Sequence, residues 1–119
     1  MKRDMDLARK ILLAVEEKDD HVIPFVPAIE NYDKKQINYH IQLLDQAGLV
    51  ESKSSSTLAD GTKWSIKSLT FSGHDFLDAS RNDTIWSKAK ESIKSKGLSL
   101  TLDLLKMALN DAAMSQFKG

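Results

Sequence analysis

One segment, INYHIQLLDQAGLV at positions 37–50, constrains the fold of this chain more than any other. Ile37, Ile41 and Leu44 recur at spacings of four and three residues, which places them on one face of an α-helix. Gly48 follows, and a glycine there takes the left-handed conformation that ends a helix. The apolar Leu-Val pair after it starts a strand. The segment therefore predicts a helix that leads directly into a β-hairpin.

Apolar residues at helical spacing predict further helices on both sides of this segment. Leu7, Ile11 and Val15 form such a stripe near the N-terminus, and a continuous leucine and alanine stripe runs through the last helix. Polar caps and glycines indicate where the helices begin and end. The predicted helices cover residues 4–18, 34–47, 72–80 and 83–97, and a fifth begins at Ser99 or Thr101. The candidate caps are Asp33 for the second helix, Ser72 for the third, and Asp83 or Thr84 for the fourth.

A β-hairpin is predicted after the central helix. Its strands are residues 49–53 and 63–71, and residues 54–62 form the polar loop between them. Buried positions in a strand alternate, but Ile66 and Leu69 have opposite parity. A bulge, or burial on both faces, is therefore expected near Lys67 or Ser68.

Two prolines shape the region before the central helix. Pro24 and Pro27 exclude a central strand over residues 22–27, so an extended edge segment is expected where a helix-turn-helix would carry its second helix. The predicted fold class is α+β, mainly α: a winged helix-turn-helix-like domain with a β-hairpin wing and extra C-terminal helices. Residues 1–82 form its core, and residues 83–119 are expected to pack on that core as a helical extension, giving one domain overall.

Composition excludes several classes of function. The chain has no cysteine, which excludes disulfides and thiolate metal sites, and neither a signal peptide nor a long apolar run is recognisable. We therefore expect a cytoplasmic protein with no membrane segment. His21, His40 and His74 lie far apart and lack the spacing of a helical metal pair, and His40 is interpreted as a packed polar residue. Without a phosphate-binding glycine loop or a nucleophile motif, no enzyme activity, metal or cofactor is predicted.

Four phrases in a fixed order resemble a known family. They are MKRDMDLARKILLAVEE, INYHIQLLDQAGLV, LTFSGHDFLDASR and DTIWSKAK, and together they span most of the chain. They are similar to the domain-of-unknown-function family 2513, small phage- and prophage-associated bacterial proteins. The resemblance implies a winged-helix-like domain with extra C-terminal helices, and it transfers neither a catalytic residue nor a ligand.

The candidate site lies on the exposed face of the central helix and on the hairpin. Amides there can pair with adenine edges in the major groove, and lysines can meet phosphates. The alternative is that these are ordinary solvated surfaces. The candidate nucleic-acid-binding residues are Lys34, Lys35, Gln36, Asn38, Tyr39, Gln42, Lys53 and Lys63.

The sequence is compatible with two functions. The first is a DNA-binding protein of phage or prophage origin, acting as an accessory transcriptional regulator on double-stranded DNA. The second is a protein-protein interaction module of the same fold that docks on a phage or host protein without binding DNA. Seventeen basic and seventeen acidic residues give no net charge, which weakens the first reading. A homodimer through the C-terminal helix fits either function.

Overall fold

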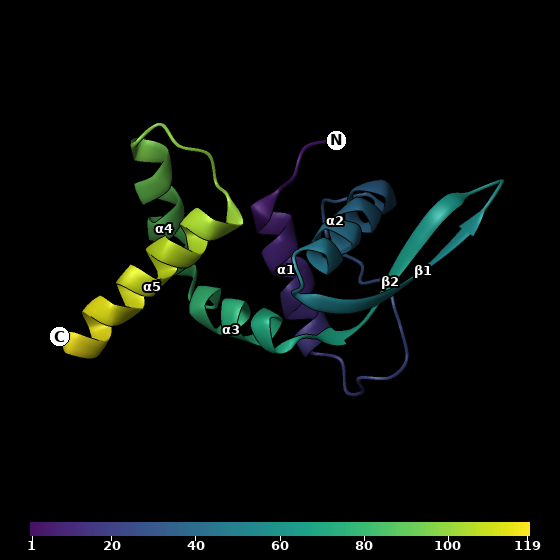
Figure 1. The fold of residues 1–119 in the computed structure, drawn as a ribbon, viewed down its shortest axis with the longest axis horizontal. Coiled ribbons are helices and arrows are strands. Elements are labelled where there is room, and N and C mark those ends of the chain that lie inside the picture. The colour runs from purple at the N-terminus through teal and green to yellow at the C-terminus, as the bar shows by residue number, and fades with distance from the viewer. The chain divides into compact units, whose positions relative to one another are not determined.

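The computed structural model describes all residues, 1–119, and shows an α+β fold that is mainly helical (Figure 1). The α+β, mainly helical prediction is therefore confirmed. The chain forms two compact units, Met1–His74 and Asp75–Gly119. Its elements are α1 (Met5–Glu16), α2 (Lys34–Gln46), β1 (Val50–Thr57), β2 (Gly61–Leu69), α3 (Phe71–Ser80), α4 (Asp83–Ser95) and α5 (Leu102–Lys118).

The core of the first unit is built from the apolar stripes of α1 and α2 together with the base of the hairpin. Leu7, Ile11 and Ile41 are fully buried, as the helical spacing predicts. Ile66 of β2 is also fully buried. Removing these side chains from water is the main favourable term in folding a unit of this size. Packing of α1, α2 and the hairpin around this core leaves the polar face of α2 outside.

No helix lies between α1 and α2, as predicted, and an extended segment takes its place. Phe25 forms an antiparallel bridge with Ile66, in which each N–H donates to the partner's carbonyl at 3.0 and 2.8 Å. The edge-segment prediction is thus confirmed. Earlier in this segment, the N–H groups of Ile23 and Val22 donate to the Asp20 carboxylate and lower its pKa to about 2.

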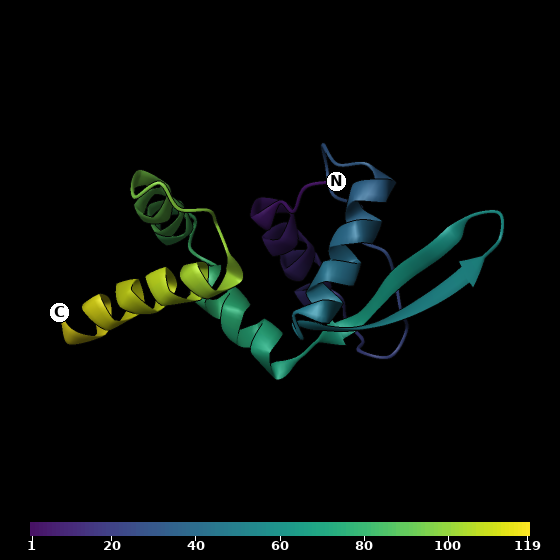
Figure 2. The same cartoon turned by 45° about the horizontal axis from the view of Figure 1, so that its top comes forward.

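The hairpin is longer than predicted. Most of the expected loop belongs to the strands, because the ladder continues to the pair Thr57 and Gly61. Serine and threonine tolerate solvent on both faces of a ladder, and the Ser56 and Thr62 hydroxyl oxygens lie 2.8 Å apart across it. Figure 1 and Figure 2 show the outer part of the hairpin extending past α2. The sequence predicts a loop there because residues 54–57 and 61–63, the outer parts of the two strands, contain no buried residue.

The predicted bulge is confirmed at Lys67. Glu51 pairs with Ser68, whereas the next residue of β1, Ser52, pairs with Ile66. Lys67 is therefore the extra residue on β2, and the parity of burial changes there. This shift lets both Ile66 and Leu69 turn towards the core.

The ends of the helices follow capping chemistry, with two corrections. Gly48 ends α2 with φ +74°, as predicted, and Thr101 caps α5. The cap of α3 is Thr70 rather than Ser72, because the Thr70 hydroxyl accepts from the Gly73 N–H at 3.0 Å. Asn82, rather than Asp83 or Thr84, caps α4. In both cases the helix begins one residue or more before the expected position.

The second unit has its own apolar core. Trp86 of α4 is buried and meets Phe76 edge-on, with ring centroids 6.2 Å apart. Leu105 and Leu109 of α5 are also buried, so α4 and α5 pack through the predicted stripes. None of the five helices combines the length and apolar character needed to cross a membrane.

Candidate nucleic-acid interface

The N-terminus of α2 presents two lysines to solvent. Asp33 caps the helix through a capping box with Gln36, as its position predicts. Lys34 and Lys35 follow in the first turn, which contains no acidic residue. Positive side chains in a first turn oppose the helix dipole, so these lysines do not stabilise α2. Both side chains are exposed at this end of the helix, directly after the capping residue Asp33.

A groove runs between this end of α2, residues 26–32 and residues 60–63 of the hairpin, and we call it the α2 groove. Its volume is about 690 Å³. Lys34, Lys35 and Lys63 line it, and we call these three residues the basic rim. None of the three forms an ion pair. The fold thus brings together lysines that lie almost thirty residues apart in the sequence.

The wall of the α2 groove is apolar. Val26, Pro27 and Ile29 line it from the loop before α2, and Ile37 lines it from the helix. Val26 is 53% exposed, which is high for a valine. Sequence reasoning missed this wall, because an apolar loop residue has no periodicity that shows which way it faces.

Asn38 ties α2 to the hairpin. Its amide nitrogen donates to the Thr62 carbonyl at 3.0 Å, and its amide oxygen accepts from the Trp64 N–H at 2.7 Å. Asp45, two turns further along α2, accepts from the Ser52 hydroxyl at 2.7 Å. The two contacts hold both strands against one side of the helix. The amide predicted to read a base is therefore engaged with backbone in this structure.

Replacing Asn38 by alanine is expected to lower the free energy of unfolding by about 1–2 kcal/mol, because two backbone groups of β2 lose their partner. Hydrogen exchange at the Trp64 N–H should quicken at the same time. Gln42→Ala is the matched control, since the Gln42 amide forms no hydrogen bond with the hairpin and its loss should change neither quantity. Equal stability of both variants would show that Asn38 does not brace the hairpin.

The other candidate residues occupy separate positions. Lys53 is exposed on β1 and pairs with Ser65, which places it on the same hairpin face as Lys63 as a diagonal neighbour. Gln36 accepts from the Asp33 N–H within the capping box. Tyr39 and Gln42 are half-buried on α2 and do not line the groove. The structure thus gathers Lys34, Lys35, Asn38 and Lys63 at one groove and leaves the other four around it.

His40 is a packed polar residue, as interpreted from the sequence. It is 2% exposed, and its Nε2 accepts from the Asp4 N–H at 2.8 Å. Its Nδ1 lies 2.8 Å from the Gln36 carbonyl oxygen, which only accepts. The partners therefore fix the neutral tautomer with the proton on Nδ1. No group of three or more histidine, aspartate or glutamate side chains in the chain is placed to hold a metal ion.

Asp4 extends this network to the groove. Its carboxylate caps α1 through the N–H groups of Asp6 and Leu7, and its second oxygen accepts from the Tyr32 hydroxyl at 3.1 Å. Burial raises the pKa of Tyr32, and the neighbouring Asp4 charge raises it further. The Tyr32 ring lines the α2 groove. One wall of the groove is thus fixed through Asp4 to the start of α1.

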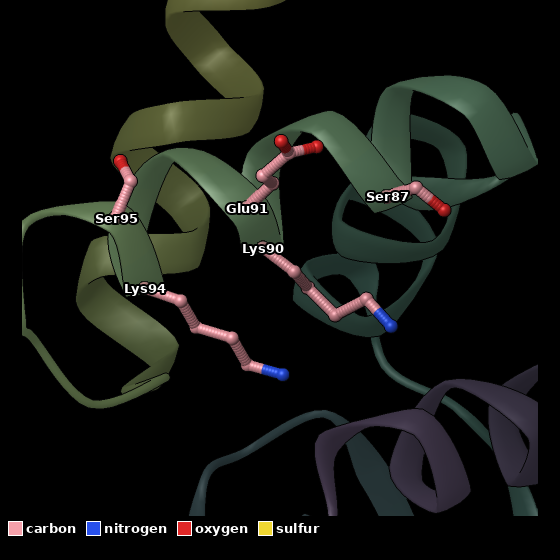
Figure 3. Close-up of a pocket in the computed structure, with 5 residues that line it drawn as sticks. All are labelled: Ser87, Lys90, Glu91, Lys94 and Ser95. Carbon is pink, nitrogen blue, oxygen red and sulfur yellow. The ribbon is translucent and has the colours of Figure 1, made fainter.

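A second depression lies along α4, with a volume of about 460 Å³. Figure 3 shows Lys90 and Lys94 extending to the same side of the helix, one turn apart, while the Glu91 carboxylate points away from them. The Lys90 ammonium lies 5.6 Å from the centre of the Trp86 ring. All the lining residues belong to α4, so the depression has no second wall, and the α2 groove is the stronger candidate.

Comparisons with known proteins identify the family. A family model described as "Hypothetical protein (DUF2513)" matches residues 2–99. The chain belongs to domain-of-unknown-function family 2513. A protein of Haemophilus influenzae (strain ATCC 51907 / DSM 11121 / KW20 / Rd), named "Uncharacterized protein", is 40% identical over 107 residues, which cover 89% of this chain and 90% of the relative. No solved structure matches. The resemblance to family 2513 is thus confirmed, and its site must be argued from the residues themselves.

Proposed function

We propose that this member of family 2513 is a winged-helix protein that binds double-stranded DNA. In this proposal α2 enters the major groove and the β1–β2 hairpin is the wing. The order of helix, glycine and hairpin supports the assignment, as does the polar outer face of α2. The capping box fixes the start of α2, and the Asn38 hydrogen bonds hold the hairpin against this helix.

One observation carries the proposal. Lys34, Lys35 and Lys63 converge on the α2 groove without a carboxylate partner, although the chain as a whole has no net charge. Two of them lie where the dipole of α2 disfavours a cation. Phosphates neutralise such a cluster of lysines. A local excess of charge can act in a neutral protein, because field strength depends on nearby charges.

The remaining candidate residues are proposed to have two roles, which are contact with DNA bases and contact with DNA phosphates. Gln42 and Tyr39 lie on α2, where a glutamine amide can pair with adenine. Lys53 lies beside Lys63 on the hairpin, where both suit phosphate contact. A phage or prophage origin rests on the family resemblance, and an accessory role in transcription rests on the proposed DNA binding alone.

The test is fluorescence anisotropy of the protein against a mixed-sequence duplex between 50 and 200 mM salt. Three to four phosphate contacts predict a loss of affinity of about 40- to 150-fold over this range. The double variant Lys34→Glu/Lys35→Glu should abolish binding at 50 mM salt, because two attractive contacts become repulsive.

The matched control carries the same change of net charge elsewhere. Lys88 and Lys96 are exposed on and after α4, so Lys88→Glu/Lys96→Glu should retain most of the affinity. An equal loss in both double variants would contradict a specific interface on α2. So would an absence of binding by the unchanged protein at 50 mM salt.

A second candidate function is a protein-protein interaction module of this fold that does not bind DNA. It is favoured by three large apolar side chains that α5 leaves in solvent: Met107, 62% exposed, Met114, 44%, and Phe117, 88%. They recur at helical spacing and form a separate stripe from the buried leucines. A phage or host protein, or a second copy of this chain, would cover them. Absence of DNA binding in the titration above favours this function.

A further inference from the structure

We infer that the α2 groove is a binding site for a small amphipathic anion, a molecule with an apolar body and a negatively charged head. Its volume of about 690 Å³ lies within the range of small-molecule sites. The groove is formed by three separate segments of the first unit, so it has opposing walls. Val26 is 53% exposed and Ile29 is half-buried, so part of the apolar wall is open to solvent in the first unit.

The wall residues suit an apolar body. Val26, Pro27 and Ile29 form a continuous aliphatic stretch, and Tyr32 adds an aromatic ring. The Tyr32 hydroxyl is engaged by Asp4, so the ring is held in place as part of the wall. Covering exposed aliphatic carbon is favourable in proportion to the area removed from water. Val26, at 53%, is the most exposed large apolar side chain among the residues that line the groove.

The basic rim suits an anionic head. Lys34, Lys35 and Lys63 stand against one carboxylate of the lining, that of Asp60. The excess of positive charge is therefore complementary to an anion and repels a cation. A neutral apolar ligand would gain nothing from these three exposed ammonium groups. Charge and wall chemistry together select a carboxylate or phosphate attached to a short aliphatic or aromatic body.

Regulation of DNA binding through the α2 groove rests on the proposed function. The same lysines are proposed to meet DNA phosphates, so an anion in the groove competes for them. Occupancy of the groove should then weaken DNA binding. The ligand site itself does not depend on DNA, and it can be measured on the protein alone.

The first experiment is a titration of backbone amide chemical shifts with octanoate, using acetate and octan-1-ol as comparison ligands. Octanoate should give saturable shifts at Ile29, Tyr32 and Lys34, with a dissociation constant of about 0.1–5 mM. Acetate supplies the head without the body, and octan-1-ol the body without the head. Each should bind at least about fivefold more weakly. Absence of saturable shifts in the groove, or equal shifts with acetate, would overturn the inference.

Two variants locate the ligand. Val26→Ser should weaken octanoate binding about fivefold, because it removes apolar wall without changing charge. Val22→Ser is the matched control: Val22 is 62% exposed in the same segment but does not line the groove. Lys34→Gln/Lys35→Gln should weaken octanoate binding about tenfold through loss of the head contact. If Val26→Ser binds octanoate as well as Val22→Ser does, the ligand lies elsewhere and the inference is wrong.

A competition measurement separates the ligand site from its consequence. Saturating octanoate should weaken DNA binding by the unchanged protein at least about fivefold and have little effect on Val26→Ser. If the protein binds octanoate in the groove but no DNA, the proposed function fails and the ligand site stands. If it binds DNA but no octanoate, the ligand site fails and the proposed function stands.

Discussion

Replacing Gly73 by alanine is expected to lower the free energy of unfolding by about 3 kcal/mol, although alanine is the better helix former by about 1 kcal/mol. Gly73 is buried in the first turn of α3. A Cβ atom on it would lie 2.0 Å from the Leu49 carbonyl oxygen and 3.0 Å from the carbonyl carbon. Such contacts are far inside van der Waals distance, so the backbone of one segment would have to move.

Leu49 has little freedom to move. Its N–H donates to the Leu44 carbonyl at the end of α2, and its carbonyl accepts from the Thr70 N–H at 3.0 Å. Its side chain is 2% exposed. Denaturant unfolding followed by circular dichroism measures the effect, with Ser72→Ala as control. Ser72 is the exposed neighbour on the same helix, and its replacement should change stability by less than about 0.5 kcal/mol. Equal stability of the two variants would show that α3 does not approach Leu49 closely.

Local patterns account for the parts of the fold that were predicted correctly. Ile37, Ile41 and Leu44 are buried because helical periodicity depends only on spacing, which the sequence displays directly. The bulge at Lys67 was visible as a change of parity between Ile66 and Leu69. The capping box at the start of α2 also involves neighbours in sequence. In each case the interaction that decides the structure lies within a few residues.

Features of the structure that the sequence does not predict depend on contacts between distant residues, or involve side chains without apolar periodicity. Serines 54–56 have no apolar alternation, so the sequence predicts a loop where the structure has the outer ladder of the hairpin. The hydrogen bonds of Asn38 to β2 span more than twenty residues, so local sequence patterns do not predict them. The apolar wall of the α2 groove is likewise not predicted from the sequence. Lys34, Lys35 and Lys63 were chosen as candidates, but the apolar wall between them had no sequence signal.

His40 couples the start of α1 to α2, and its loss is the second large effect that we expect. His40→Leu should lower the free energy of unfolding by about 2–4 kcal/mol, because the Asp4 N–H would be left without its partner. Leucine fills much of the volume, so the loss reports the hydrogen bonds more than a cavity. Denaturant unfolding measures it, and exchange of the Asp4 N–H should quicken.

Two polar replacements distinguish the two ring nitrogens. The amide oxygen of a glutamine reaches approximately where Nε2 lies, so His40→Gln should recover about 1 kcal/mol by accepting from the Asp4 N–H. The shorter amide of His40→Asn reaches only towards the Nδ1 partner and should recover less. Similar stability of the leucine and glutamine variants would contradict a role for the Asp4 contact. Because Asp4 also holds Tyr32, loss of His40 should loosen the wall of the α2 groove and weaken octanoate binding as well.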